Sequence, residues 1–254
     1  MIIVISPAKT LDLKPNVHTK KYSLPYFLDD SKLLINELRK LNPKEIVRLM
    51  KVNNEIANLN FERNLSWRLP FNEDNAKQAI LTFKGQVYIG LNAKSLKEED
   101  LLFAQEHLRI LSGLYGVLKP LDLIQAYRLE MGIPLKNPKG KNLYEFWGNK
   151  ITDMINKEIS NQSQKTLINL ASNEYFKAIK PKQIKGNIIT PVFKELRGDV
   201  FKMITIYAKT ARGLMSRFII ENRIENPEDI KAFDTQGYLY NRDLSTKTDW
   251  VFTR

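Results

Sequence analysis

Two segments of the sequence carry the residue types that acid–base chemistry or anion binding would need. Ser6–Thr10 and Asn169–Lys177 each follow a short apolar run that is typical of a buried strand. Loops that leave the ends of strands are where α/β proteins build ligand sites. In such a site Lys9 would neutralise a phosphate or carboxylate, and Glu174 and Tyr175 would transfer protons if they were buried beside an anion. The two loops are therefore candidates for an enzyme site that takes a small anionic or nucleic-acid substrate.

A structural interpretation of the same residues stays open beside the catalytic one. The Ser6–Thr10 loop lacks the glycines and the spacing of a phosphate-binding P-loop, so nucleotide hydrolysis is not indicated. Ser172 is expected to cap a short helix on which Glu174 and Lys177 form an ordinary surface pair. The sequence has no Ser/His/Asp triad and no paired-carboxylate signature. Catalytic residues therefore stay unassigned, and a binding protein is favoured over an enzyme.

The composition excludes several other classes of protein. Cysteine is absent, which removes disulfides, thiolate metal sites and a cysteine nucleophile. The histidines are His18 and His107, too few for a histidine-rich site, so we expect no metal and no cofactor. The apolar run Ile2–Ile5 is too short for a signal peptide or a membrane span. These features predict a cytoplasmic protein that does not contact membranes.

The charge balance favours a polyanionic partner. Forty Lys and Arg residues against 28 Asp and Glu leave a formal net charge of +12. Such an excess attracts nucleic acid, because cations that bind phosphates release condensed counterions. The charge is also concentrated, since residues 175–223 hold eleven basic and three acidic side chains. The basic ones are Lys177, Lys180, Lys182, Lys185, Lys194, Arg197, Lys202, Lys209, Arg212, Arg217 and Arg223.

A helix predicted over residues 209–223 gives this charge a direction. At about 100° per residue, one face would carry Lys209, Arg212, Ser216 and Arg223, which suits phosphate oxygens. The opposite, buried face would carry Ala211, Leu214, Met215 and Phe218. A merely solvated basic face is the alternative interpretation.

Two glycines and a lysine in residues 107–124 suggest a second phosphate contact. A predicted helix ends at Ser112-Gly113, and Gly116 and Lys119 follow after Leu114-Tyr115. This arrangement resembles a helix-hairpin-helix, in which glycines let backbone N–H groups approach a phosphate closely. The usual motif has one residue between its glycines and this chain has two, so a helix C-cap followed by a tight turn is an equal alternative.

Helical and strand-like patterns alternate along the chain, which predicts a mixed α/β architecture. We expect helices at about 30–51 with a fresh start at Pro43, and at about 73–82, 95–112, 143–159 and 209–223. For the helix at 95–112, Ser95 is the expected N-cap and Glu98 its capping-box partner. We expect strands at 2–5, 86–91, 166–170, 187–193 and 200–207, and strand and loop in the tail. No repeat, low-complexity tract or linker interrupts the pattern, so residues 1–254 are predicted to form one compact domain.

Several blocks of sequence resemble the YaaA-type family of bacterial peroxide-stress resistance proteins. The blocks occur in the family's order and span nearly the whole chain. They are Ile5–Asp12, Phe83–Gly85, Leu111–Gly116, Lys119–Asp122, Tyr127–Gly132, Asn169–Ser172, Glu174–Phe176 and Ala211–Phe218.

The resemblance implies a cytoplasmic DNA-binding protein that helps bacteria to survive hydrogen peroxide and limits iron-driven damage to DNA. It implies a single mixed α/β domain of unusual topology, with a basic cleft and a helix-hairpin-helix. Carried onto this chain, the hairpin would be Leu111–Gly116 with Lys119, so Ser112, Gly113, Tyr115 and Gly116 would face DNA. The cleft candidates are Lys9, Lys177, Lys209, Arg212 and Arg217. We expect the partner to be duplex or branched DNA bound with little sequence specificity, and a monomer is favoured.

Overall fold

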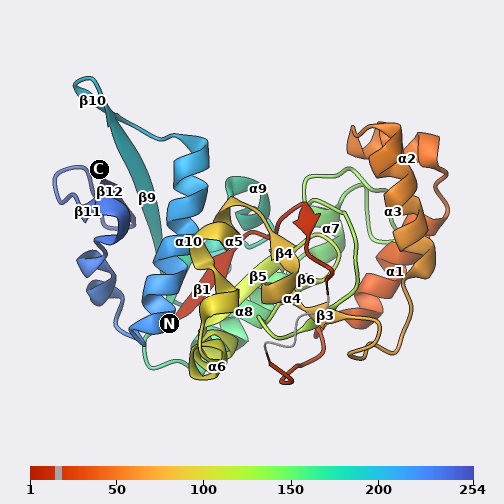
Figure 1. Ribbon diagram of the computed structural model, residues 1–254, viewed down its shortest axis with the longest axis horizontal. Helices are drawn as coiled ribbons and strands as arrows, with labels where there is room; N and C mark the ends of the chain where they lie inside the picture. The colour runs from red at the N-terminus through yellow and green to blue at the C-terminus, as the bar shows by residue number, and fades with distance from the viewer. Residues whose placement is uncertain (15–18) are drawn as a thin grey trace.

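The computed structural model describes residues 1–14 and 19–254 and contains an eight-stranded sheet within them (Figure 1). The neighbouring strands run in the order β11-β12-β9-β8-β1-β5-β6, and β10 pairs with β9. Pairings along the centre, from β12 to β5, are parallel, and β11, β6 and β10 are antiparallel to their neighbours. The strands are β1 Ile2–Ile5, β5 Leu108–Ser112, β6 Gly116–Leu118, β8 Thr166–Leu170, β9 Asn187–Arg197, β10 Val200–Lys202, β11 Leu239–Tyr240 and β12 Asp249–Thr253.

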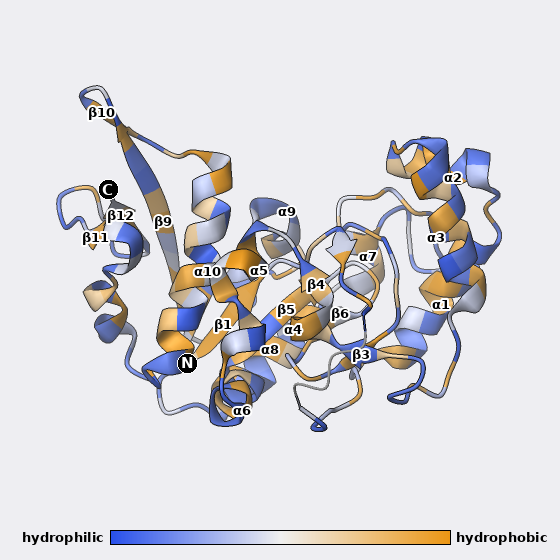
Figure 2. Cartoon of the chain, in the orientation of Figure 1, coloured by the Kyte–Doolittle hydropathy of each residue, from blue (hydrophilic) through white to orange (hydrophobic). Residues whose placement is uncertain are grey.

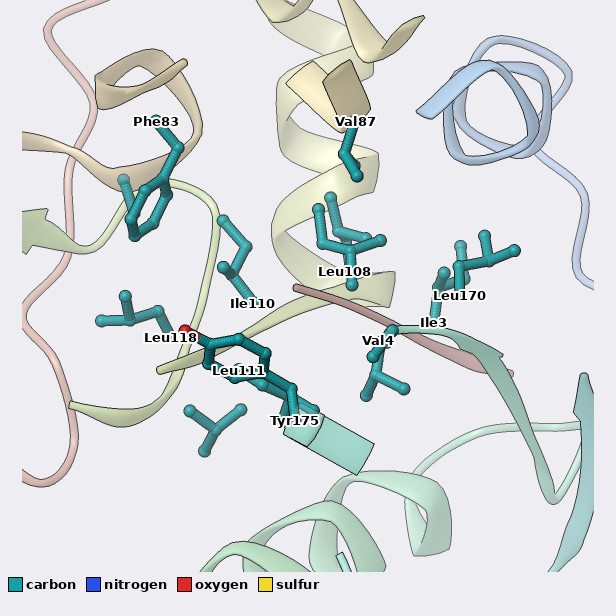
Figure 3. Packing of buried hydrophobic residues seen from close by; sticks show 14 of the residues in the cluster. Ile3, Val4, Phe83, Val87, Leu108, Ile110, Leu111, Leu118, Leu170 and Tyr175 are labelled. Atoms are coloured by element: carbon teal, nitrogen blue, oxygen red, sulfur yellow. The ribbon is translucent and has the colours of Figure 1, made fainter. Parts of the chain in front are cut away.

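The three central strands are buried along their whole length. Every residue of β1, β5 and β8 is buried, as expected for parallel strands that are covered on both faces. Ile3 pairs with Leu108 on one side and with Ile168 on the other. Figure 3 shows the side chains of these strands packed against one another and against Tyr175, and in Figure 2 β1 is hydrophobic along its length. The strands predicted at 2–5 and 166–170 are thus confirmed.

Helices cover the two faces of this sheet. Those on one face include α5, α6 and α10, and those on the other include α7 and α8 together with the connection from β8 to β9, which is hydrogen-bonded to α8 (Figure 1). The helices are α1 Leu28–Arg39, α2 Pro43–Met50, α3 Asn54–Ser66, α4 Ala79–Thr82, α5 Gln86–Leu91, α6 Glu98–His107, α7 Leu143–Trp147, α8 Lys150–Ser160, α9 Asn173–Phe176 and α10 Thr205–Glu221. The two small sheets pair β2 Thr10–Leu11 with β4 Phe83–Lys84, and β3 Lys77–Gln78 with β7 Leu123–Ile124. No helix of the described residues has the length and apolar content to cross a membrane.

A close contact between two glycines fixes α10 against α5. A Cβ atom added at Gly213 would lie 1.9 Å from the carbonyl oxygen of Val87, and one added at Gly90 would lie 2.2 Å from that of Thr210. The backbones of the two helices therefore touch, which larger residues would prevent. This contact explains why the strand predicted at 86–91 is wrong. Its β-branched and aromatic residues favour a strand locally, but packing against α10 makes it a helix.

Several other boundaries differ from the prediction. The helix predicted at 73–82 exists only as α4, and the strand predicted at 200–207 ends at Lys202 because α10 begins at Thr205. Helix α6 begins at Glu98, and the backbone N–H of Lys97 donates to Asp100 at 2.9 Å, so Ser95 does not cap it. The helices predicted at 30–51 and 209–223 are confirmed as α1 with α2 and as α10. The helix predicted at 143–159 is two helices, interrupted at Gly148, where φ is +52°.

The segment 107–124 is a β-hairpin rather than a helix followed by a hairpin. Helix α6 ends at His107, Leu108–Ser112 forms β5, and Gly116–Leu118 returns as the antiparallel strand β6. The helix-hairpin-helix predicted here is therefore wrong. Apolar residues at 108, 110 and 111 fit either a buried helix or a central strand, and the sheet uses them as a strand beside β1.

Candidate nucleic-acid interface

The structure divides the cations singled out in the sequence into neutralised and available ones. Lys9 lies 3.1 Å from Glu130, and Lys119 lies 3.9 Å from Glu158. Arg217 pairs with Glu221 at 2.6 Å and also donates to the carbonyl oxygens of Leu91 and Asn92. A cation held by a carboxylate is a weaker phosphate ligand, because binding DNA would leave the carboxylate beside a phosphate. Lys9, Lys119 and Arg217 are therefore poor candidates.

The basic face predicted for α10 is only partly present. Ser216 is fully buried and its hydroxyl donates to the carbonyl oxygen of Arg212 at 2.8 Å, so it cannot reach a phosphate. Arg223 lies beyond the helix and pairs with Asp100 at 2.7 Å. Lys209 is exposed, and Arg212 is half-buried, so that burial lowers the pKa of its guanidinium. In the described part of the chain neither of these two cations forms a salt bridge.

The residues nominated for the hairpin are all inside the protein. Ser112 and Tyr115 are fully buried, and the Ser112 hydroxyl lies 2.7 Å from that of Tyr127. A Cβ atom at Gly113 would lie 2.2 Å from the carbonyl oxygen of Leu129, so this glycine serves close packing. Gly116 is the first residue of β6 and has a φ of +70°, which favours glycine. None of the four can contact a phosphate.

A helical hairpin does exist elsewhere, in α2 and α3. Lys51, at a φ of +52°, ends α2, and the side chain of Asn53 accepts the backbone N–H of Ile56 to begin α3. Exposed Lys44, Arg48 and Lys51 lie on or beside α2. The signals that could have found it are the caps Asn42 and Asn53, which stand before each helix.

One face of strand β9 is only partly covered by the described residues. Its odd-numbered residues from Ile189 to Glu195 are buried, and Phe193 packs near Phe233, whose ring lies 5.5 Å from Phe218 of α10. The even-numbered residues therefore point to the opposite side, where α7 and α8 lie. They are only half-buried or exposed, because α8 packs on β1 and lies away from β9 and β12 (Figure 1). These residues are Ile188, Thr190, Val192, Lys194 and Leu196.

The connection from β8 to β9 forms a lysine-rich border on the same side as this face. It is anchored to α8 by two hydrogen bonds. The backbone N–H of Lys180 donates to the hydroxyl of Thr152, and the backbone N–H of Lys185 donates to the side-chain oxygen of Asn156. The connection also lines a groove of about 680 Å³, with Phe176, Lys177, Ile179, Lys180, Pro181 and Lys182 among its residues. Four exposed lysines and the half-buried Lys194 of the sheet thus share one side of the molecule: Lys177, Lys180, Lys182 and Lys185.

These five lysines, which we call the lysine border, are available to anions. None of them forms a salt bridge within the described residues, and only Lys180 has a side-chain hydrogen bond there, to the neutral Asn149. Lys177 is the only member named individually as a site residue from the sequence. The other four belong to the charge cluster of residues 175–223, but the sequence alone does not show that they share one side, because this depends on the path of the β8–β9 connection.

The alternative enzyme site lies at the carboxyl ends of the strands. The strand order reverses at β1, because the chain passes from β1 to β5 on one side and only later to β8 on the other. Ser6 follows β1 and Ser172 follows β8, and the backbone N–H of Ser172 donates to the Ser6 hydroxyl at 2.9 Å. This is the place where open α/β sheets bind ligands.

The candidate catalytic residues are only partly brought together there. Lys9 and Tyr175 line one cavity, whereas Glu174 turns away and accepts the backbone N–H of Gly132 at 3.0 Å. The carboxylate in that cavity is the buried Glu130, which the sequence did not single out and which contacts Lys9 and Arg128. Burial raises the pKa of Tyr175, so its hydroxyl stays protonated. The cavity holds about 10 Å³, which is room for about one water molecule.

The sequence leads us to expect no metal site, because it contains only the histidines His18 and His107. His107 is buried, stacks on Phe103 with the ring centres 4.1 Å apart, and faces the carbonyl oxygen of Met1. Burial lowers its pKa, which favours the neutral ring. His18 lies outside the described residues. In the rest of the chain no cluster of three or more His, Asp or Glu side chains has the geometry to hold a metal ion.

Comparison with known proteins places the chain in a family. The family model described as "Peroxide stress protein YaaA" matches residues 1–244. A relative from Colwellia psychrerythraea (strain 34H), described as a UPF0246 protein, is 54% identical over 254 residues, covering 100% of this chain and 99% of the relative. The chain therefore belongs to the YaaA family of peroxide stress proteins, and this membership implies a role in the response to peroxide.

Proposed function

We propose that this protein binds DNA in the cytoplasm during the response to hydrogen peroxide, and that it does so mainly through phosphate contacts of the lysine border. The observation that carries the proposal is that these five lysines share one side of the molecule and have no carboxylate partner in the described chain, while Lys9, Lys119, Arg217 and Arg223 are all paired. Lys209 and Arg212 are also unpaired, but they lie on α10, on the other face of the sheet. Free ammonium groups on one side of a protein are suited to a line of phosphates.

The chemistry of this surface favours contacts to the backbone of DNA over reading of its sequence. Lysine ammonium groups bind phosphate as point charges and have no fixed hydrogen-bond geometry. The exposed sheet residues between them are mostly aliphatic, so they offer few groups that could recognise base edges. We therefore expect similar affinities for unrelated duplex sequences.

This binding mode also suggests how DNA is protected from iron. Cations condense along DNA, and each lysine that contacts a phosphate displaces them. Ferrous ions held at the backbone would be released in the same way, so that hydroxyl radicals form farther from the bases and sugars. The protein needs no metal ligands of its own for this effect.

The first experiment is a fluorescence anisotropy titration of the full-length protein against duplex, single-stranded and branched DNA of equal length. We expect binding to duplex and branched DNA, with little difference between sequences. The comparison variant carries Lys177→Gln, Lys182→Gln and Lys194→Gln, and it should bind more weakly to every sequence by a similar factor. Equal binding by this variant would show that DNA, if bound at all, lies on another surface.

The enzyme alternative is tested in the same samples. Loss of the labelled strand or turnover of added nucleotide would reveal a hydrolytic activity. A Glu130→Gln variant, which changes the buried carboxylate beside Lys9 and Tyr175, should leave DNA binding unchanged under our proposal. A loss of turnover in that variant would favour the site at the strand ends.

A further inference from the structure

The hairpin of β9 and β10 extends beyond the rest of the sheet (Figure 1). Pairing with β12 ends at Lys194, and the backbone N–H of Leu196 donates to the carbonyl oxygen of Arg254 at 2.8 Å. Beyond this point β9 pairs only with β10, through a two-residue turn at Gly198 and Asp199. Gly198 has a φ of +60°, and a Cβ atom there would meet nothing within 4 Å. We call residues 195–203 the arm.

The arm exposes large apolar side chains to solvent. Leu196 is 51% exposed, Val200 56% and Met203 59%. Ile206 and Tyr207, at the start of α10 next to the arm, are 52% and 39% exposed. A concentration of this kind in a few residues marks a surface that contacts a partner.

The two faces of the arm are alike, which limits the kind of partner. The register pairs Val200 with Arg197 and Lys202 with Glu195, so these four lie on one face. Glu195 is buried at the base of the arm, where Arg254 holds its carboxylate at 2.9 Å. Leu196 pairs with Phe201 on the other face, which Lys194 shares. Apart from the buried Glu195, each face therefore combines apolar and cationic side chains, and the exposed Asp199 lies in the turn between the strands. A hairpin that docks onto the surface of another protein needs only one apolar face, whereas a groove surrounds both.

We propose that the arm enters the minor groove of duplex DNA, where Leu196 and Val200 contact sugars and base edges and Arg197 and Lys202 contact phosphates. Neither cation has a carboxylate partner within the described residues, and Arg197 lies only over the ring of Tyr207. Apolar wedges on minor-groove proteins partly unstack base steps and bend the duplex. This inference rests on the proposed DNA binding and adds the groove and the bend to it.

The position of the arm agrees with the lysine border. Strand β9 joins the two, because Lys185 lies two residues before the strand, Lys194 lies on its partly covered face and the arm is its far end. A duplex that runs along the border would meet the arm at one end of the strand.

The test is a bending assay by energy transfer between dyes at the two ends of an A·T-rich duplex of about 30 base pairs, with the full-length protein. We expect the wild-type protein to bring the ends closer together. The variant Leu196→Thr with Val200→Thr places β-branched residues, which favour strands, at both positions and should abolish the bend. It should also weaken binding about tenfold, as expected when two aliphatic contacts are lost. Ile89→Thr, on an apolar side chain of α5 that is 61% exposed, is the matched control and should behave as wild type.

The outcomes separate the arm from the lysine border. Two results would overturn the role of the arm and leave the proposed function intact. One is that the wild-type protein binds DNA without bending it, and the other is that the double variant bends DNA as strongly as wild type. A protein that binds no duplex overturns both. Sedimentation of the free proteins tests whether the arm instead contacts a second copy of the chain. A wild-type dimer that is absent in the double variant would show such a contact and would also overturn the proposal. Unchanged thermal melting of the variant would show that the arm was altered without unfolding.

Discussion

The dependence of DNA affinity on salt is the sharpest consequence of the lysine border. The logarithm of the association constant falls with the logarithm of salt concentration, with a slope of about −0.9 for each phosphate contact on duplex DNA. Five free lysines therefore predict a slope of about −4.5. Between about 50 mM and about 200 mM KCl, the association constant should fall about 500-fold.

Removing three of these lysines changes the slope by a defined amount. In the variant with Lys177→Gln, Lys182→Gln and Lys194→Gln, about two border contacts remain, so the same rise in salt should lower affinity only about twelvefold. If the arm adds contacts, both slopes become steeper by the same amount. The difference between wild type and variant, about 2.7, is therefore the quantity to measure.

A variant with the same net charge serves as the control. Lys21, Lys40 and Lys94 each form a salt bridge, to Glu98 at 2.9 Å, to Glu37 at 2.8 Å and to Asp12 at 2.7 Å. Replacing all three by Gln removes the same three charges from the formal +12 without touching the border. Anisotropy titrations at several KCl concentrations should give this control the wild-type slope. If the two triple variants have the same slope, net charge alone governs binding and the reasoning fails.

Three further changes test the fold and its electrostatics. Gly213→Ala would place a Cβ atom 1.9 Å from the Val87 carbonyl oxygen, so we expect a loss of about 3 kcal/mol or more in urea unfolding, and a wild-type midpoint would contradict the helix contact. Glu158→Gln removes the partner of Arg109, whose side chain is 3% exposed, and should cost about 3–5 kcal/mol, whereas a neutral result would mean that Arg109 is otherwise compensated. The hydrogen bond from Lys94 lowers the pKa of Asp12 to about 2, so the pair's contribution to stability is complete above the carboxyl's ordinary value of 3.8 and is lost as the pH falls through about 2. NMR titration of Lys94→Gln should show the Asp12 midpoint rising toward 3.8, and an unchanged midpoint would exclude Lys94 as the cause.

The sequence predicts the fold best where local preference and tertiary environment agree. β1 and β8 are short β-branched runs buried on both faces, and α10 has a long helical pattern. The errors fall where an apolar run fits two structures. Residues 86–91 favour a strand by composition but form a helix against α10, and residues 108–112 fit the helical pattern of α6 but complete the centre of the sheet.

The candidate site shows a different limit. The concentration of cations between residues 175 and 223 is visible in the sequence, and the lysine border lies inside it. The sequence does not show which of these cations are free, because the carboxylate partners of the paired ones are distant in the chain. Arg223 pairs with Asp100 and Lys9 with Glu130, each across more than a hundred residues of sequence. Only the folded chain separates the neutralised cations from the available ones.

The contact between α5 and α10 has a consequence for dissecting the protein. It joins residues on either side of a long intervening stretch, and the hydroxyl of Thr210 donates to Gln86 across 124 positions. Contacts so distant in sequence form late in folding, because closing the intervening loop costs entropy first. An excised fragment from Asn173 onward would lack the surface on which α10 rests, so its many cations would be displayed on an unfolded chain. Any affinity for DNA measured on such a peptide would report flexible polycation binding and say nothing about the intact protein.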